Sequence, residues 1–359
     1  MSGLGASEEE ILARISTRRA APAQLTDRRI TMAHGAGGRA SAALVEALFL
    51  RELDNPQLAG LDDASPVPGA AGLVMTTDAF VVRPLRFPGG GIGELAVHGT
   101  VNDLAACGAR PLALSAAFVL EEGLATAELA EQVGAMAAAA RHCGVPIVAG
   151  DTKVVERGRA EGCYVITTGI GRVELTGLAP GGCTQGDALL CSAPIAAHGI
   201  AVLTARHELA IDAPIVSDTR SLWPLVEPLV DLAGSIHALR DATRGGVATV
   251  LNELAVSSGV EAVVDEAALP VQAAVRGACE LLGIDPLYVA NEGVLIAAVA
   301  AEVADEVLGR WREVPAGEQA VRIGEIERRL APGRVLVDTA VGGRRILDTL
   351  VGDPLPRIC

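Results

Sequence analysis

The most informative residues of this chain are acidic side chains in otherwise apolar surroundings. Each stands beside an apolar run, at a turn of small residues, or within an apolar helical segment. A carboxylate in such a place costs free energy unless a cation accompanies it, and Mg²⁺ binds one or two carboxylates together with phosphate oxygens. Any single residue could be a helix cap or a turn residue, but the set predicts a site for Mg²⁺ and a nucleotide. Its members are Asp62, Asp63, Asp78, Asn102, Asp103, Asp151 and Asp241.

Two glycine-rich segments, 34–38 and 89–91, have the composition of turns that present backbone N–H groups to phosphate. Glycine turns are common, so each signal is weak by itself. The chain contains no G-x-x-x-x-G-K-[ST] sequence, which argues against a nucleotide site of the P-loop kind.

Lys153 is the only lysine among 29 lysine and arginine residues. Arginine replaces lysine well as a surface charge but poorly as a compact ammonium group. Lys153 follows Asp151 and Thr152 after an apolar run at 145–149, and the end of a strand is a favoured place for active-site residues in α/β folds. The lysine count alone leaves two interpretations open: Lys153 has a chemical role, or it is a loop residue that is lysine by chance.

Glu292 and Cys359 are two further candidates, each with an ordinary alternative. Glu292 lies in an Asn-Glu-Gly turn before an apolar run at 294–299, where it could be only a turn carboxylate. Cys359 is the last of seven cysteines and ends a Gly- and Pro-containing segment, 342–359, that reads as an extended tail. Such a tail could reach roughly 50 Å and carry a thiol-bound group, although a terminal cysteine can also be accidental.

The other cysteines show neither a disulfide framework nor zinc-ribbon spacing, and they read as small buried apolar residues. The chain is 50% hydrophobic and 2% aromatic with a net charge of −15, which disfavours binding to nucleic acid or to an anionic membrane surface. No apolar run approaches the length of a membrane-spanning helix. The first ten residues carry acids where a signal peptide needs bases, so we predict a cytoplasmic protein.

The candidate residues are distributed over a mixed succession of strands and helices, which predicts an α/β or α+β fold. The Gly/Pro-rich stretch 178–186 predicts a domain boundary, giving an extension (1–28), two domains (29–178 and 179–341) and a tail (342–359). We predict helices at 40–50, 93–107, 126–142, 199–207 and 222–232, and another starting at 247. We predict strands at 29–33, 73–77, 112–120, 145–149, 164–173, 188–192, 260–264, 294–299, 321–326 and 335–337.

Several longer motifs together resemble the HypE family of hydrogenase maturation proteins, a branch of the aminoimidazole-ribonucleotide-synthetase-like (PurM-like) ATP enzymes. The resemblance covers the chain from about residue 30 to its end, and PRIC with AGDTKVV is specific to the HypE branch. The motifs are HGAGG (34–38), LDDA (61–64), TTDAFVV (76–82), FPGGGIGELAVHGTVNDLAACGARP (87–111), AGDTKVV (149–155), DATRGGVATVLNELA (241–255), NEG (291–293) and PRIC (356–359). The N-terminal extension, Gly91, Arg83 and Arg86 depart from the family pattern.

The resemblance implies two α/β domains, the first contributing strands to the β-barrel of a homodimer. It implies ATP-dependent dehydration of a carbamoyl group on the terminal cysteine to a thiocyanate, which supplies cyanide to the iron of a [NiFe]-hydrogenase. The expected cofactors are ATP and Mg²⁺, and the expected partners are a HypF-type carbamoyl transferase and the HypC–HypD scaffold complex. Another enzyme of the class, such as a selenophosphate synthetase or a thiamine-phosphate kinase, and a thiol carrier that does not use ATP are the alternatives.

Carried onto this sequence, the family pattern assigns a role to each candidate. Cys359 is expected to carry the substrate, and Glu292 is the expected base. Lys153 is expected to have an orienting or charge-donating role. Asp63, Asp103 and Asp241 are the expected metal ligands. The expected nucleotide-binding residues are Gly37, Gly38, Asp63, Asp78, Asn102, Asp103, Asp151 and Thr152.

Overall fold

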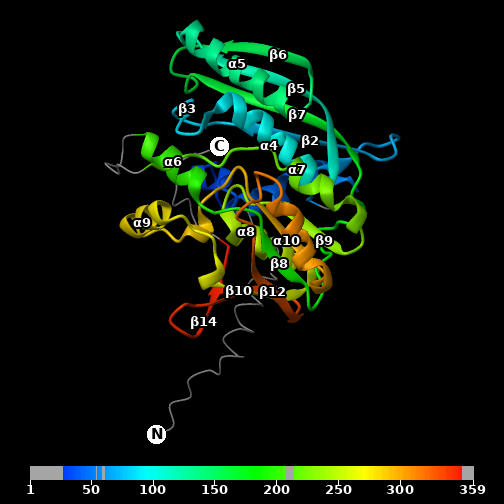
Figure 1. Cartoon of the computed structure of the whole chain (residues 1–359). Helices are drawn as coiled ribbons and strands as arrows, with labels where there is room; N and C mark the ends of the chain where they lie inside the picture. Colours follow the sequence, from blue (N-terminus) through cyan, green and yellow to red (C-terminus); the bar gives the residue numbers. More distant parts are fainter. Residues whose placement is uncertain (1–26, 54, 59–60, 207–213, 350–359) are drawn as a thin grey trace.

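The computed structural model describes residues 27–53, 55–58, 61–206 and 214–349, and these build two β-sheets with helices packed around them (Figure 1). The mixture of sheets and helices confirms the predicted α/β class. The predicted extension, 1–28, lies almost wholly outside the described residues, as does Cys359. Among the described residues, no helix combines the length and apolarity needed to cross a membrane.

The first sheet has five strands in the order β1-β2-β7-β5-β6, and only β5 and β6 run parallel. Inward and outward residues alternate along β2 and β7, and helix α4 covers the inward face. Met75 and Ile170 remain exposed on the outward face. The strands are β1 (Ser65–Pro66), β2 (Leu73–Phe80), β5 (Ala109–Glu121), β6 (Ile147–Val155) and β7 (Cys163–Val173), with helices α4 (Ile92–Ala106) and α5 (Thr126–His142) and the short pair β3 (Arg86–Phe87) and β4 (Gly90–Gly91).

The second sheet has seven strands in the order β14-β13-β10-β12-β8-β11-β9, and within it β10 and β13 run parallel. Its strands are β8 (Ala188–Cys191), β9 (Ile236–Asp241), β10 (Val260–Asp265), β11 (Leu295–Val299), β12 (Val321–Arg329), β13 (Arg334–Asp338) and β14 (Arg344–Leu347). The helices of this half are α6 (Ala197–Ala205), α7 (Trp223–Val226), α8 (Gly246–Ser258), α9 (Ala273–Leu282) and α10 (Ala304–Arg312), with 3-10 turns at Glu227–Leu232, Glu266–Ala268, Pro286–Tyr288 and Ala301–Val303.

Three sequence-based predictions about these elements are wrong. Residues 29–33 do not form a strand: Met32–Gly35 is a 3-10 turn, where the Thr31 N–H donates to His34 Nδ1 at 3.1 Å in place of a strand ladder. The predicted tail, 342–359, begins with β14, which pairs with β13. The strand predicted at 145–149 is β6, which continues to Val155, so the following motif lies inside a strand and not at its end.

Helix α4 lies between the two halves of the molecule (Figure 1). It is buried on nearly all sides, and its side chains Leu95, Val97 and Val101 are completely buried. Gly93 allows α5 to approach closely, since a Cβ there would lie 2.0 Å from the backbone oxygen of Gln132. The helix contacts β2, β5 and β7 of the first sheet and β9 and α7 of the second half. It therefore places Asn102 and Asp103 at the junction of the two halves.

After the 3-10 turn, the chain forms α2 (Arg39–Leu44), a π-helical segment (Val45–Leu50) and the short α3 (Arg51–Leu53), which together confirm a helix at 40–50. The glycine-rich turn at 34–38 precedes them. Gly37 adopts a φ of +76°, and a Cβ there would lie 3.0 Å from the Cβ of Arg244. This turn therefore packs closely against the turn that follows β9.

Candidate functional site

A cavity of about 410 Å³ lies at the junction of the two halves, and six of the predicted site residues line it. Its lining includes Gly37, Asp63, Asp78, Asp103, Asp241 and Glu292. These residues are separated by up to 255 positions in the chain, from Gly37 to Glu292 (292 − 37). The structure thus brings together in one cavity side chains that lie far apart in the sequence.

Each carboxylate of the cavity is held by a different element. Asp78 points inward from β2, and Asp103 lies near the end of α4. Asp63 lies in the loop before β1, Asp241 ends β9, and Glu292 stands in the turn before β11. Strand ends and loops of both halves therefore surround one space, as expected for an active-site cleft.

The cavity is strongly acidic, and its carboxyl groups perturb one another. Burial raises the pKa of Asp103, and the nearby charges of Asp241 and Asp78 raise it further, while a hydrogen bond from Thr76 Oγ1 to Asp103 Oδ2 (2.8 Å) opposes the shift. Burial raises the pKa of Asp241 to about 6. The pKa of Glu292 is also raised, first by burial and then by Asp78 and Asp218. Such crowding of carboxyl groups in a cleft is typical of functional sites.

Arg240 is the principal cationic residue of this cavity that the sequence analysis missed. Its side chain is buried, its Nη1 forms an ion pair with Asp63 and lies 3.4 Å from Asp62 Oδ1, and its Nη2 donates to Leu61 O at 3.3 Å. A lone arginine next to Asp241 in an apolar strand was the signal that could have identified it. Arg244 also lines the cavity, and its Nη1 donates to Gly35 O at 3.2 Å.

Two carboxylate oxygens of the cavity are available to a cation. Asp63 Oδ2 and Asp241 Oδ2 are buried, and neither accepts a hydrogen bond within the described part of the chain. Unpaired carboxylate oxygens of this kind are the hard oxygen ligands that Mg²⁺ prefers. Asp103 lines the same cavity and would be the third carboxylate. Among the described residues, the ligand atoms that lie within 4.8 Å of one another belong to Asp62, Asp63 and Cys107, so Asp103 and Asp241 would have to move closer to Asp63 to share one ion with it.

We expect Mg²⁺ to stabilise the folded protein more above pH 6 than below it. The pKa of Asp241 rises from 3.8 to about 6 on folding, so the folded state binds more protons than the unfolded state between these values. Stability therefore falls as the pH rises through this window, because the crowded carboxylates become charged. Thermal unfolding midpoints with and without Mg²⁺ across this range measure the effect. A midpoint shift that is the same at every pH, or unchanged in Asp241→Asn, would contradict it.

Asp151, Thr152 and Lys153 do not line the cavity. They lie on β6, the edge strand of the first sheet, and all three are exposed. Lys153 Nζ donates to Asp151 Oδ2 at 2.6 Å, and this ammonium group lowers the pKa of Asp151. Within a single chain, these three residues therefore lie outside the cavity that the acidic residues line.

Other predicted residues lie beside the cavity without lining it. Gly38 precedes α2, and Gly89 in the second glycine-rich turn packs against Ser217, whose N–H donates to Pro88 O at 2.8 Å. Asn102 is buried, and both ends of its side-chain amide bond to backbone groups. These hydrogen bonds link α4 to the backbone at Arg220, Leu222 and Glu292.

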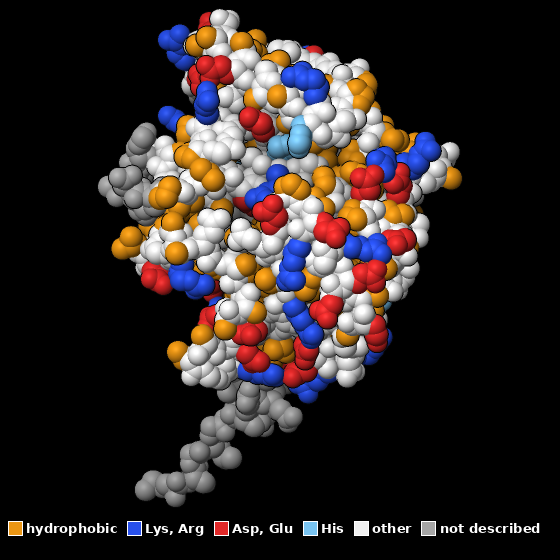
Figure 2. Space-filling view, in the orientation of Figure 1, with side chains coloured by type: hydrophobic (Ala, Val, Ile, Leu, Met, Phe, Trp, Pro, Cys, Tyr) orange, Lys and Arg blue, Asp and Glu red, His pale blue; other side chains and the backbone are white. Residues whose placement is uncertain are grey.

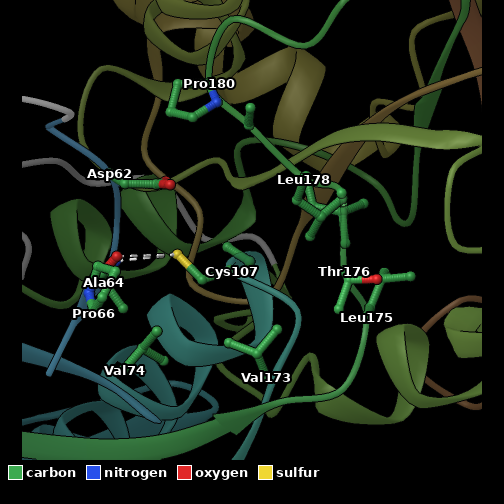
Figure 3. Close-up of a pocket in the computed structure, with 14 residues that line it drawn as sticks. Asp62, Ala64, Pro66, Val74, Cys107, Val173, Leu175, Thr176, Leu178 and Pro180 are labelled. Carbon is green, nitrogen blue, oxygen red and sulfur yellow. Dashed lines mark hydrogen bonds between the residues drawn. The ribbon is translucent and has the colours of Figure 1, made fainter. Parts of the chain in front are cut away.

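A second cavity of about 210 Å³ lies behind the loop that carries Asp62 and Asp63 (Figure 3). Apolar residues form most of its wall, with the thiol of Cys107 next to Ala64. The Ala64 N–H donates to Cys107 Sγ at 3.1 Å. Burial, followed by the charges of Asp63 and Asp62, raises the pKa of Cys107, so this thiol stays protonated and serves to hold the loop.

The sequence and the fold of this chain are similar to those of known proteins. The N-terminal domain of AIR synthase related proteins matches residues 61–173, and the corresponding C-terminal domain matches residues 184–334. "Carbamoyl dehydratase HypE" of Cupriavidus necator is 50% identical over 343 residues, which are 94% of this chain and 97% of that protein.

Solved structures give the same result. The structure described as "Crystal structure of HypE-HypF complex" has a TM-score of 0.81 and 43% identity, covering 86% of this chain and 100% of the matched chain. A HypE structure in complex with ATP has a TM-score of 0.77 and 46% identity, covering 92% of this chain and 100% of the other. The shared motifs, the shared fold and identities near one half place this chain in the HypE family of hydrogenase maturation proteins.

Proposed function

We propose that this chain is an ATP-dependent carbamoyl dehydratase that converts an S-carbamoyl group on Cys359 into a thiocyanate for the maturation of [NiFe]-hydrogenase. The observation that carries the proposal is the convergence of six carboxyl residues on one cavity in a chain of the HypE family. They are Asp63, Asp78, Asp103, Asp241, Glu253 and Glu292.

The reaction needs groups that this cavity contains. An amide oxygen is a poor leaving group, so phosphorylation of the carbamoyl oxygen by ATP turns it into phosphate. Loss of that phosphate and of both N–H protons then forms the nitrile, with ADP as the other product. Glu292 would accept a proton from the amide nitrogen, and its raised pKa makes its carboxylate a stronger base. The buried cavity walls would keep water from the activated group.

We assign the acidic residues by their positions in the cavity. Asp63, Asp103 and Asp241 would hold Mg²⁺, which supplies neutralising charge for the transferring phosphoryl group when it is bound. Asp78 and Gly37, which line the same cavity, would lie beside the nucleotide. Asp151 and Thr152 lie on β6. They would contribute to nucleotide binding only if β6 reached the cavity of a second copy of the chain, as proposed below for Lys153.

The partners follow from the chemistry of the family. A HypF-type carbamoyl transferase would supply the carbamoyl group, and the solved HypE–HypF complex of a relative supports this pairing. The HypC–HypD scaffold complex would receive the cyanide.

We also propose that a second copy of the chain covers β6. This strand ends the first sheet, and Val148 and Val154 on it are 67% and 68% exposed. An exposed apolar edge strand is a template for pairing with another strand. Pairing of this kind would carry Lys153 to the cavity of the second copy, which accounts for its distance from the cavity of its own chain.

Lys153→Arg is expected to leave the fold intact and to slow dehydration strongly, because the guanidinium group cannot reproduce a compact ammonium group. A single-turnover measurement of thiocyanate formation tests this, with Arg157→Lys in the turn after β6 as the control. An unchanged rate in Lys153→Arg would contradict the assignment.

Mixing two inactive variants tests whether Lys153 acts across the dimer. A Lys153→Ala chain and a Glu292→Gln chain would form one intact cavity in a mixed dimer, so activity should return on mixing. If mixing restores nothing, Lys153 serves its own chain.

The proposed function is tested by mass spectrometry of the C-terminal peptide after incubation with the transferase, carbamoyl phosphate and Mg-ATP. We expect carbamoyl addition followed by ATP-dependent loss of water, and neither change in Cys359→Ala. A carbamoyl adduct that persists in the presence of ATP would identify a thiol carrier instead. Normal modification of Cys359→Ala would show that the terminal thiol is not the acceptor.

A further inference from the structure

A buried carboxylate outside the acidic cavity holds the turn that carries Glu292. Asp218 is only 5% exposed and lies between α6 and α7. Its Oδ2 accepts hydrogen bonds from the backbone N–H groups of both Glu292 (3.2 Å) and Gly293 (3.0 Å). Its other oxygen, Oδ1, has no hydrogen-bond partner within the described residues. A buried carboxyl oxygen without a hydrogen-bond partner costs free energy, so local stability alone does not explain this residue.

The backbone of Glu292 is also held from its other side. Asn102 Nδ2, on α4, donates to Glu292 O (3.3 Å) and to Arg220 O (3.0 Å), and Asn102 Oδ1 accepts from Leu222 N (2.8 Å). The N–H group of Glu292 is thus bonded to the segment of Asp218, and its carbonyl accepts from Asn102 of α4 and from the Arg220 N–H group (3.4 Å). This arrangement fixes the peptide groups on both sides of the Glu292 Cα atom.

The next residue shows how closely these segments approach. A Cβ at Gly293 would lie 2.0 Å from the backbone oxygen of Asp218, so no larger residue fits without displacing the chain. This close contact therefore fixes the position of the turn around Glu292 relative to the segment around Asp218.

We propose that Asp218 is a positioning residue, which orients Glu292 toward the cavity by holding the backbone of its turn. This inference rests on the proposed role of Glu292 as the base. Asp218 does not line the acidic cavity, so it acts through Glu292 and does not touch the substrate. Asn102, which adjoins Asp103 on α4, couples the same turn to an expected metal ligand.

A second buried aspartate provides a matched control. Asp187 is 2% exposed and accepts hydrogen bonds from Thr184 N (2.7 Å) and Thr184 Oγ1 (2.9 Å), and it also contacts His237. It lies in the same half of the molecule but does not line the cavity. Replacing it removes a comparable set of buried hydrogen bonds without a direct effect on Glu292.

The experiment compares Asp218→Ala, Asp218→Asn and Asp187→Ala in the full-length protein. Asp218→Ala is expected to lower the single-turnover dehydration rate about 100-fold, the effect of a displacement of about 1 Å, with ATP affinity almost unchanged. Hydrogen exchange at the amides of Glu292 and Gly293 should accelerate. Asp218→Asn keeps an acceptor oxygen and should recover most of the rate. Asp187→Ala should lower stability but not the rate per folded molecule.

Two outcomes separate this inference from the proposed role of Glu292. If Asp218→Ala leaves exchange at the two amides unchanged, or lowers activity only in proportion to its folded fraction, the positioning role is wrong. If Glu292→Gln is fully active, the base assignment fails, while the exchange measurement still tests the backbone contact. In a Glu292→Gln background, Asp218→Ala should cause no further loss of rate, since the two residues act as a unit.

Discussion

Glu292→Gln is expected to lower the single-turnover rate of dehydration about 10²- to 10⁴-fold, the usual contribution of a general base. The amide is nearly the same size as the carboxylate but cannot accept a proton from the carbamoyl nitrogen. Glu292 is 3% exposed and its backbone is held on both sides, so the variant should fold normally. ATP binding should change little, because Glu292 is assigned to the amide and not to the phosphates.

The pH dependence gives a second readout for Glu292. Burial and neighbouring carboxylates raise its pKa, and a base is active only when deprotonated. The wild-type rate should therefore fall as the pH drops through this raised pKa, and the residual rate of Glu292→Gln should lose that dependence. Quenched-flow measurement of thiocyanate formation provides the rates, with exposed Glu302→Gln as the control. A variant rate within a few-fold of the control would assign the base elsewhere.

Arg240→Met is expected to destabilise the folded protein by about 3–5 kcal/mol at neutral pH, the typical effect of removing one partner from a buried ion pair. Methionine preserves part of the apolar stem but leaves Asp62 and Asp63 without their cation. Asp241, the next residue, then adds repulsion that Arg240 no longer offsets. The loss should be smaller at acidic pH, where these carboxyl groups take up protons.

Urea unfolding followed by circular dichroism measures this loss. Arg322→Met is the matched control, since Arg322 forms an exposed pair with Glu325 (2.6 Å). Exposed pairs contribute about 0–1 kcal/mol, so the control should be nearly neutral. Equal losses in the two variants would show that the buried ion pairs of Arg240 contribute no more to stability than an exposed pair.

The sequence predicted the fold class and most helices and strands because their apolar periodicity is local. Helix α5 begins and ends at the predicted residues, Thr126 and His142. The strand predicted at 29–33 failed because the His34 ring satisfies the Thr31 N–H, a local hydrogen bond that a hydrophobic pattern does not report. The extent of β6 was missed because its polar residues pair with β5, which precedes it by more than twenty residues.

The acidic residues of the site were recognisable because carboxylates stand out in apolar segments. Their partners were not, because an ion pair between residues 63 and 240 spans 177 positions of the chain. Asp218 escaped notice for the same reason: its hydrogen bonds reach Glu292 across 74 positions. Lys153 was conspicuous by composition, yet composition does not reveal that its strand lies at the edge of a sheet.

The central position of α4 has a mechanical consequence. The helix packs on the first sheet, while Asn102 is hydrogen-bonded to backbone groups of the second half. A hinge motion that separated the halves along α4 would break these buried bonds, each with a net contribution of about 0.5–1.5 kcal/mol, and would expose an apolar helix to water. These costs oppose a hinge motion along α4, so we expect the two halves to stay together when a substrate binds.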